Sequence, residues 1–490
     1  MFFQKGWCLD NNGYPNSGPE VERLIAVRPS PGQLAFGDME YYSFIHFGMN
    51  TFTNSEWGTG KESPALFSPE TIDTDQWCEV LKASGSRAVI LTAKHHDGFC
   101  LWPSAHTEHS VKNSPYLGGK GDVVRQMMES CKKYGMKFGI YLSPWDRNAA
   151  TYGTDAYNDF YVNQLTELCT NYGEVFEYWF DGACGEGPNG KRQAYDFDRY
   201  FAVIKELRPQ ALTAIVGRDV RWIGNEAGKA RESEWSVVSS GNAKYEAVAE
   251  RSQKADGDTA VLERVSEEEA DLGSREKVLR YRNLVWYPAE ADTSITPGWF
   301  YHENSYYGQK NQMLKTAGQL ADIYFNTVGG NATLLLNVPP SPRGVIEERD
   351  VKLLQEFKAH IDKVFALPVT TFSLSVLSQN EKRTPAGLES LKTGGSYCFA
   401  KDEYILSCRF EREEQIAAIV IQEDIRHSQR VEAFSVFAGR DGQHENLADC
   451  TVIGSKRIIR LKEHVRADEI CFVFTQSRGN PVIKSVAFFS

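Results

Sequence analysis

Asp181 is the clearest candidate for a catalytic residue in this 490-residue sequence. It ends the apolar run Glu177–Phe180 (EYWF) and is followed by Gly182, which lets the backbone turn. A carboxylate at the end of a buried strand is fixed and partly desolvated, as a nucleophile should be. The alternative interpretation is an aspartate that caps a helix or closes a turn.

One reaction open to such a carboxylate is the cleavage of a glycosidic bond with retention of configuration, which requires a second carboxyl group, roughly 5–5.5 Å from the nucleophile, that acts first as acid and then as base. Glu226, in the segment after the fifth predicted strand, is our candidate. Spacing along the chain does not choose between it and four competing glutamates, which are Glu56, Glu232, Glu234 and Glu290.

Polar and aromatic residues follow the ends of several predicted strands, including His46, His95, His96 and Tyr141. In a barrel of alternating strands and helices the carboxyl ends of the strands meet at one face, so these side chains are expected to gather there. Such a mouth suits a sugar, whose hydroxyl groups need hydrogen bonds while its C–H face packs on rings.

The adjacent pair His95-His96 does not indicate a metal site. Neighbouring residues of a strand point to opposite faces, so we expect that they cannot both bind one ion. Neither an HxH nor an HExxH motif accompanies them. None of the ten cysteines forms a CxxC pair, so a thiolate zinc site is not expected either.

The elements that position these residues form a series of βα units with a spacing of roughly 40 residues. We predict eight barrel strands, at Tyr41–Met49, Ala88–Thr92, Lys137–Leu142, Val175–Phe180, Thr213–Val216, Glu234–Val238, Arg282–Tyr287 and Ala332–Val338. Amphipathic helices are predicted between them, at Asp75–Ser84, Asp122–Tyr134, Ala156–Tyr172, Asp196–Leu207 and near Gln309–Asn326, and Glu347–Ala366 closes the barrel. The polar stretch Ser239–Leu279 is predicted to be an active-site insertion or a long mobile loop.

After Leu367-Pro368 the pattern changes to short strands separated by turn signals. The expected strands are Ser396–Phe399, Glu403–Phe410, Ile416–Gln422, Ala433–Gly439, Arg457–Leu461 and Glu469–Thr475. The predicted architecture is therefore a (β/α)8-type barrel over residues 1–366 and an all-β sandwich over residues 367–490.

Composition excludes several classes of protein. The formal charge of −11 argues against nucleic-acid binding, which needs a basic surface. The sequence contains no run of 18 or more apolar residues, so no membrane-spanning helix is expected. The first residues, MFFQKGWCLDNNGYP, lack a signal-peptide core, so we expect a cytoplasmic protein, or a periplasmic or secreted one if a signal peptide has been removed.

The sequence resembles glycoside hydrolase family 29, the α-L-fucosidases. The matching segments occur in order along the barrel, at His46–Phe52 (HFGMNTF), Glu56–Gly58 (EWG), Thr92–Trp102 (TAKHHDGFCLW), Tyr141–Arg147 (YLSPWDR), Tyr178–Ala183 (YWFDGA), Arg221–Gly228 (RWIGNEAG) and Pro297–His302 (PGWFYH). The resemblance implies that Asp181 is the nucleophile. It also implies a fucose pocket lined by His46, Glu56, Trp57, His95, His96, Tyr141 and Trp299.

The GNE segment resembles the branch of the family that is restricted to α-1,3/1,4-linked fucose, and in that branch its glutamate is the acid/base, which favours Glu226. The implied activity is a retaining exo-α-L-fucosidase that acts on fucosylated glycans without a metal or organic cofactor. Three alternatives stay open: another retaining exo-glycosidase, such as an α-L-galactosidase, a glycan-binding protein without activity, and a metal-dependent barrel hydrolase.

Overall fold

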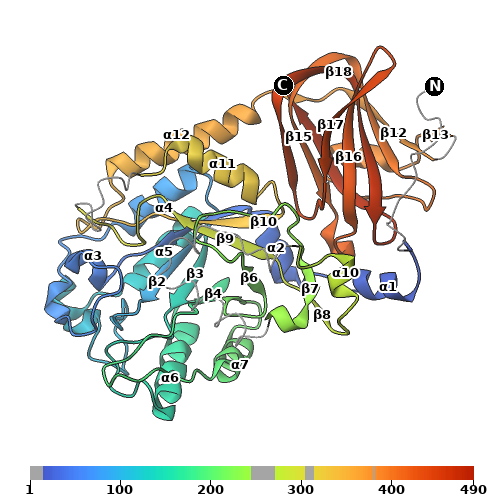
Figure 1. Ribbon diagram of the computed structural model, residues 1–490. Coiled ribbons are helices and arrows are strands. Elements are labelled where there is room, and N and C mark those ends of the chain that lie inside the picture. Colours follow the sequence, from blue (N-terminus) through green and yellow to red (C-terminus); the bar gives the residue numbers. More distant parts are fainter. Residues whose placement is uncertain (1–14, 244–270, 304–313, 379–380) are drawn as a thin grey trace.

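Eight parallel strands form a closed barrel in the computed structural model, which describes residues 15–243, 271–303, 314–378 and 381–490 (Figure 1). Around the barrel the strand order is β1-β10-β9-β6-β5-β4-β3-β2. The strands are β1 (Tyr41–Ile45), β2 (Ala88–Lys94), β3 (Lys137–Leu142), β4 (Glu177–Phe180), β5 (Leu212–Ile215), β6 (Val220–Trp222), β9 (Ala289–Ser294) and β10 (Ala332–Asn337). The predicted barrel fold is confirmed.

Two of the predicted barrel strands are wrong. The segments near Glu234–Val238 and Arg282–Tyr287 form β7 (Val237–Ser239) and β8 (Leu284–Trp286), an antiparallel pair outside the barrel. The barrel instead contains β6 and β9. These strands escape pattern analysis because β6 has only three residues and β9 carries the buried acids Glu290 and Asp292.

Four of the helices that surround the barrel are capped by a side chain at their start, and three of these, α4, α5 and α7, begin within a residue of their predicted positions. The side chains of Asp73, Asp122 and Asp196 accept hydrogen bonds from backbone N–H groups in the first turns of α4, α5 and α7. Thr316 and Gln319 form a capping box at the start of α11. The main helices are α4 (Thr74–Ala83), α5 (Val123–Tyr134), α6 (Asp155–Asn171), α7 (Phe197–Leu207), α11 (Ala317–Thr327) and α12 (Glu348–Val364).

Shorter helices are α1 (Pro19–Ile25), α2 (Pro31–Met39), α3 (Met49–Thr53) and α10 (Arg275–Val278). Residues 244–270 of the predicted insertion and residues 309–313 of the predicted helix lie outside the described residues. No helix in the described ranges is both long enough and apolar enough to cross a membrane.

The C-terminal part is all-β and antiparallel, as predicted. Two long strands, β15 (Ile405–Glu423) and β18 (Arg457–Ser477), each join two of the predicted strands across irregular register. Around them lie β11 (Pro368–Val369), β12 (Phe372–Leu377), β13 (Lys382–Arg383), β14 (Tyr397–Cys398), β16 (Val431–Arg440), β17 (Gln443–Cys450) and β19 (Val482–Phe489).

The β-sandwich packs against one side of the barrel, beside α11, α12 and the β7–β8 pair (Figure 1). The ring centroids of Phe365 and Phe489 lie 4.9 Å apart. This contact joins the end of the barrel domain to the last strand of the sandwich. The fully buried Gln429 donates to the carbonyl of Glu234 on the segment that follows β6. The sandwich therefore braces the segment that carries Glu226.

Candidate active site

Asp181 lies at the carboxyl end of β4, held by two hydrogen bonds. The hydroxyl of Tyr141 donates to Oδ2 at 2.9 Å, and the backbone N–H of Ala183 donates to Oδ1 at 2.7 Å. The side chain is 25% exposed. Asp181 thus closes a turn, as the alternative interpretation supposed, and its carboxylate also stays accessible from the barrel mouth.

Three histidines lie beside this carboxylate. The rings of His95 and His96 are only 4.1 Å apart, and those of His46 and His95 are 5.5 Å apart. The expectation that His95 and His96 point to opposite faces is wrong. Both residues follow Lys94, the last residue of β2, so strand alternation no longer applies to them.

Burial keeps the three imidazoles neutral. It lowers the pKa of His46 to about 3, with an opposing effect from its bond to Asn337. It lowers the pKa of His96 to about 4 although the charge of Asp181 acts in the other direction. The pKa of His95 is also well below the ordinary value because of burial and of its two histidine neighbours. The pocket therefore presents uncharged hydrogen-bonding groups to a ligand.

The partners of each ring indicate which nitrogen carries the proton. Asn337 donates its amide hydrogens to Ser294 and to the Trp299 carbonyl, so its oxygen accepts from Nδ1 of His46 at 2.8 Å. The hydroxyl of Ser143 donates to the Trp145 carbonyl and accepts from Nδ1 of His96 at 2.7 Å. In both histidines Nε2 is then an acceptor for a ligand hydroxyl, and that of His96 lies 3.8 Å from Asp181.

Glu56 has a more structural position than the sequence indicates. Its carboxylate accepts hydrogen bonds from the backbone N–H groups of Trp299 and Phe300 and from Nε2 of His302, the last at 2.6 Å. The glutamate is buried, and it fastens the segment that carries Trp299 across the mouth of the barrel. Asn337 lies outside every motif found in the sequence, and Ser143 and His302 lie within two of them, but the roles of all three depend on contacts between distant segments.

The two predicted tryptophans differ in exposure. Trp57 is 44% exposed and lies against Trp145, with ring centroids 5.9 Å apart. Trp299 is half-buried beside His46, at 5.1 Å between ring centroids. Both offer ring surface at the same end of the barrel as Asp181, which is the arrangement that a sugar face requires.

Glu226 lies half-buried in a tight loop after β6. The fully buried Asn225 holds this loop: its side-chain oxygen accepts from the N–H groups of Ala227 and Lys229, and its amide donates to the Lys229 carbonyl. Further along, the buried Glu234 carboxylate bonds the guanidinium groups of Arg221 and Arg231, each at 2.8 Å. These contacts fix both ends of the loop.

The competing glutamates have different surroundings. Burial alone would raise the pKa of Glu234, but the positive charges of Arg221 and Arg231 outweigh it and hold that pKa below the ordinary value. Glu290 is buried inside the barrel, where Trp179 Nε1 donates to it at 2.8 Å, and burial raises its pKa well above the ordinary value. Glu232 is exposed.

Asp292, on β9, is a buried carboxyl group that sequence analysis did not select. It accepts a hydrogen bond from Nε1 of Trp222 at 2.8 Å. Burial raises its pKa to about 7, and the charge of Asp181 contributes in the same direction. This carboxyl group therefore changes its protonation state near neutral pH, close enough to Asp181 to respond to its charge.

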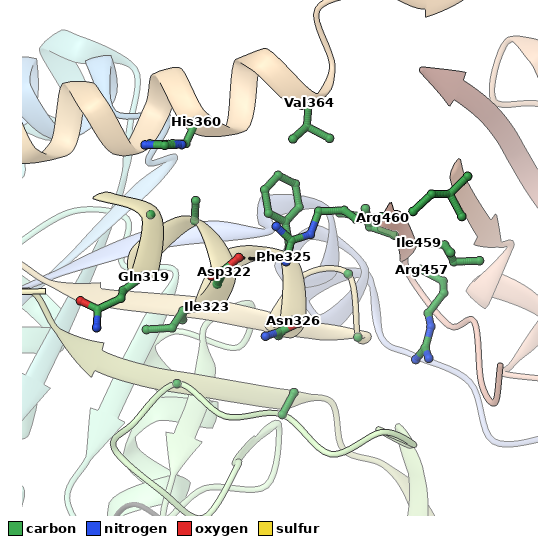
Figure 2. A pocket seen from close by; sticks show the side chains of 18 of the residues that line it. Gln319, Asp322, Ile323, Phe325, Asn326, His360, Val364, Arg457, Ile459 and Arg460 are labelled. Atoms are coloured by element: carbon green, nitrogen blue, oxygen red, sulfur yellow. Dashed lines mark ion pairs between the residues drawn. The ribbon is translucent and has the colours of Figure 1, made fainter. Parts of the chain in front are cut away.

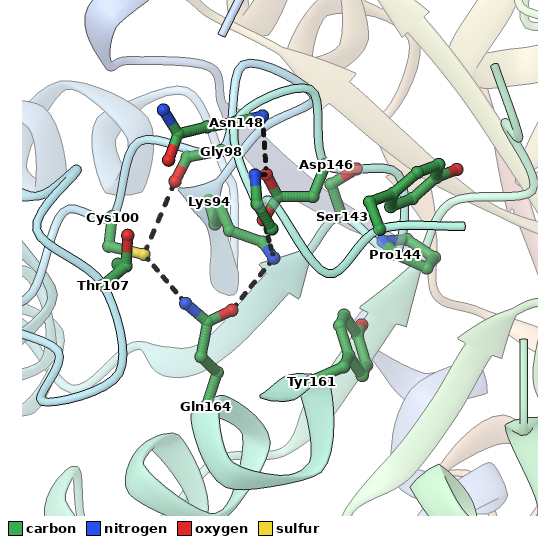
Figure 3. A network of polar contacts seen from close by, with 12 residues as sticks. Lys94, Gly98, Cys100, Thr107, Ser143, Pro144, Asp146, Asn148, Tyr161 and Gln164 are labelled. Atoms are coloured by element: carbon green, nitrogen blue, oxygen red, sulfur yellow. Dashed lines mark hydrogen bonds and ion pairs between the residues drawn. The ribbon is translucent and has the colours of Figure 1, made fainter. Parts of the chain in front are cut away.

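A buried network behind the histidines joins the ends of β2 and β3 (Figure 3). Lys94 is completely buried, and its ammonium donates to Asp146 at 3.0 Å and to Gln164 at 2.9 Å. Asp146 in turn accepts from the backbone N–H groups of Asn148 and Ala149. The network fastens the loop that contains Ser143 to the segment that contains His96.

Among the described residues, one set of side chains is close enough to share a metal ion, and it lies in the sandwich at His444, Glu469 and Cys471. Glu469 there also pairs with Arg409 at 3.3 Å and with Lys382 at 3.6 Å, two cations that compete with any metal. The absence of a cofactor stays a prediction.

A parallel barrel with a carboxylate, imidazoles and aromatic rings at the carboxyl ends of its strands defines the class of barrel glycoside hydrolases. The chain belongs to the α-L-fucosidase family, whose model matches residues 36–364. It is 39% identical to alpha-L-fucosidase 1 of Arabidopsis thaliana over 476 residues, which is 95% of this chain and 88% of the relative. The protein is thus an α-L-fucosidase, a glycoside hydrolase.

Solved structures agree with this assignment. A putative α-L-fucosidase from Bacteroides ovatus is 42% identical, with a TM-score of 0.80 over 97% of this chain and 77% of that one. A glycoside hydrolase family 29 fucosidase of Ruminococcus gnavus, solved in complex with fucose, is 28% identical, with a TM-score of 0.77 over 99% and 97% of the two chains.

Proposed function

We propose that this fucosidase releases terminal α-1,3- or α-1,4-linked L-fucose from oligosaccharides or glycoconjugates, with retention of configuration. Asp181 is the nucleophile and Glu226 the acid/base. The observation that carries the proposal is the position of Asp181, whose carboxylate is fixed by Tyr141 and a backbone N–H yet one-quarter exposed at the barrel mouth.

Elimination supports Glu226 as the second carboxyl group. Glu234 is ionised between two arginines, so it has no proton to give. Glu290 is engaged inside the barrel, Glu56 is occupied by backbone N–H groups, and Glu232 is exposed. Glu226 is half-buried on a fixed loop, which suits a carboxyl group that must hold a proton and then release it.

The reaction follows as a double displacement. Asp181 attacks the anomeric carbon while protonated Glu226 donates to the departing glycosidic oxygen. Water, deprotonated by Glu226, then attacks the fucosyl-enzyme and releases L-fucose. The Nε2 atoms of His46 and His96 accept hydrogen bonds from fucose hydroxyls, while the rings of Trp57 and Trp299 pack on its C–H surfaces.

The linkage restriction is supported by the resemblance of Arg221–Gly228 (RWIGNEAG) to the α-1,3/1,4-restricted branch of the family. A fucosylated Lewis-type trisaccharide and an aryl α-L-fucoside are the substrates that test it. Wild-type enzyme is expected to prefer the branched trisaccharide. Equal cleavage of a matched α-1,2-fucosylated oligosaccharide, assayed as a third substrate, would refute the restriction.

The mechanism is tested with Asp181→Ala and Glu226→Ala. Removal of the nucleophile is expected to lower kcat at least about 1,000-fold on both substrates. Glu226→Ala should lose most activity on the trisaccharide and less on an aryl fucoside, whose leaving group needs little protonation. NMR of the first-formed fucose should show the α-anomer; an initial β-anomer would overturn retention.

A further inference from the structure

A groove of about 1250 Å³ lies between the barrel and the sandwich, and Asp181 is not among the residues that line it. Helices α11 and α12 form two of its sides and strand β18 closes its far end (Figure 2). The remaining side is the segment from Ala227 to Glu232, which begins directly after Glu226. The groove exceeds the roughly 300–1,000 Å³ of typical small-molecule pockets, so its volume suits an extended ligand.

The charge of this groove is opposite to that of the chain. Its lining contains seven lysines and arginines against two acids, Glu232 and Asp322, whereas the whole sequence has 54 basic and 65 acidic residues. Arg460 pairs with Asp322 at 2.9 Å. Lys363 and Lys462 are exposed and have no ion-pair partner in the ranges that the structure describes. The groove therefore carries a surplus of positive charge.

Apolar surface lies between these charges. Ile323 on α11 and Val364 on α12 are half-buried residues of the lining, whereas Phe325 points toward α12 and is only 4% exposed (Figure 2). The guanidinium of Arg460 lies 4.4 Å from the centre of the Phe325 ring. Aliphatic groups with basic side chains around them suit a sugar chain that carries anionic groups, because its C–H surfaces and its anions both find partners.

One end of the groove is joined to the active site. Lys315 donates to the carbonyl of Ser294 at 2.7 Å, and the hydroxyl of Ser294 accepts from Asn337, the partner of His46. Ala227, on the same end, follows Glu226, the group that donates a proton to the leaving sugar in the proposed mechanism. One end of the groove is therefore linked to the candidate site through these hydrogen bonds and through the chain from Glu226 to Ala227.

Building on the proposed function, we propose that this groove binds an anionic, sulfate- or carboxylate-bearing part of the glycan from which fucose is removed. Attraction between exposed charges weakens with salt, since the Debye length falls from about 10 Å at 0.1 M to about 3 Å at 1 M. Preference for the anionic glycan should therefore be salt-dependent.

The first measurement compares kcat/KM for two fucosylated oligosaccharides that differ only in a sulfate on the leaving-group chain. At low salt the sulfated form should be preferred about threefold to tenfold, and the preference should vanish near 1 M salt. The variant Lys363→Gln/Lys462→Gln should lose most of it. A charge-matched control, Lys132→Gln/Lys401→Gln, changes exposed lysines of both domains outside the groove and should retain it.

The second measurement separates this inference from the proposed function. Calorimetry with the sulfated chain lacking fucose should show binding at low salt that Lys363→Gln/Lys462→Gln weakens and the control does not. If neither substrate releases fucose but the sulfated oligosaccharide binds with this salt and variant dependence, the groove inference holds and the proposed function fails. If fucose is released without preference and the sulfated chain does not bind, the groove inference is overturned alone. Equal weakening by both variants would also overturn it.

Discussion

Removal of either charge of the buried Lys94–Asp146 pair should destabilise the barrel more than removal of both. The pair is almost fully buried, with side-chain exposures of 0% and 2%, and its atoms lie 3.0 Å apart. Lys94→Met leaves the carboxylate of Asp146 without a counter-charge, and Asp146→Asn leaves the ammonium without one. Breaking a buried pair from one side costs about 3–5 kcal/mol.

The double variant Lys94→Met/Asp146→Asn leaves no unpaired charge. It loses the bond from the ammonium to Gln164, and the asparagine can still accept from the N–H groups of Asn148 and Ala149. A net loss of about 2–3 kcal/mol is expected from these bonds. The singles would sum to about 6–10 kcal/mol, so the coupling in the cycle should be at least about 3 kcal/mol.

Differential scanning calorimetry provides the assay. Each single variant is expected to lower the barrel transition by roughly 5–15 °C, and the double variant by less than the sum. Activity on an aryl α-L-fucoside should fall about 10- to 100-fold in the singles, because the network sets the spacing between Ser143 and His96. Additive losses of stability in the double variant would refute the reasoning.

Three further predictions concern neighbouring features. The pKa of Asp292 is raised from 3.8 to about 7, so its contribution to stability is complete below about pH 4 and is lost as the pH rises through 7. In urea titrations, the stability of Asp292→Asn relative to wild type should therefore increase by up to about 4 kcal/mol between pH 4 and 8. A difference that stays constant with pH would contradict this prediction. Glu234→Gln leaves the buried guanidinium groups of Arg221 and Arg231 without a carboxylate, so it should lower the free energy of unfolding by about 3–5 kcal/mol and also lower kcat. An unchanged free energy of unfolding would exclude a role of Glu234 in holding the loop. Gly98→Ala places a methyl group 2.4 Å from Asp146 Oδ1 at positive φ, so it should lower the melting temperature more than Gly118→Ala, which has positive φ but open space; equal shifts would exclude the clash.

Local signals predicted much of the architecture. Apolar periodicity located α4, α5 and α7 within about a residue, and the structure shows an aspartate cap at the start of each, a signal that acts over one helical turn. The same reasoning failed at β9, since Glu290 and Asp292 lie in the barrel interior and break the apolar run that a buried strand should show. In β15 and β18, pairs of predicted strands proved to be single bent strands.

The sequence by itself determined the barrel followed by an all-β domain, and it selected Asp181 as a strand-end carboxylate. Tertiary structure alone decided which strands close the barrel, that His95 and His96 lie side by side, and that Glu56 fastens the segment of Trp299. It also decided the charge states of the buried histidines and of Asp292. The physical reason is that caps and periodicity depend on residues a few positions apart, whereas burial and proton positions depend on contacts between segments that are tens to hundreds of residues apart in the chain.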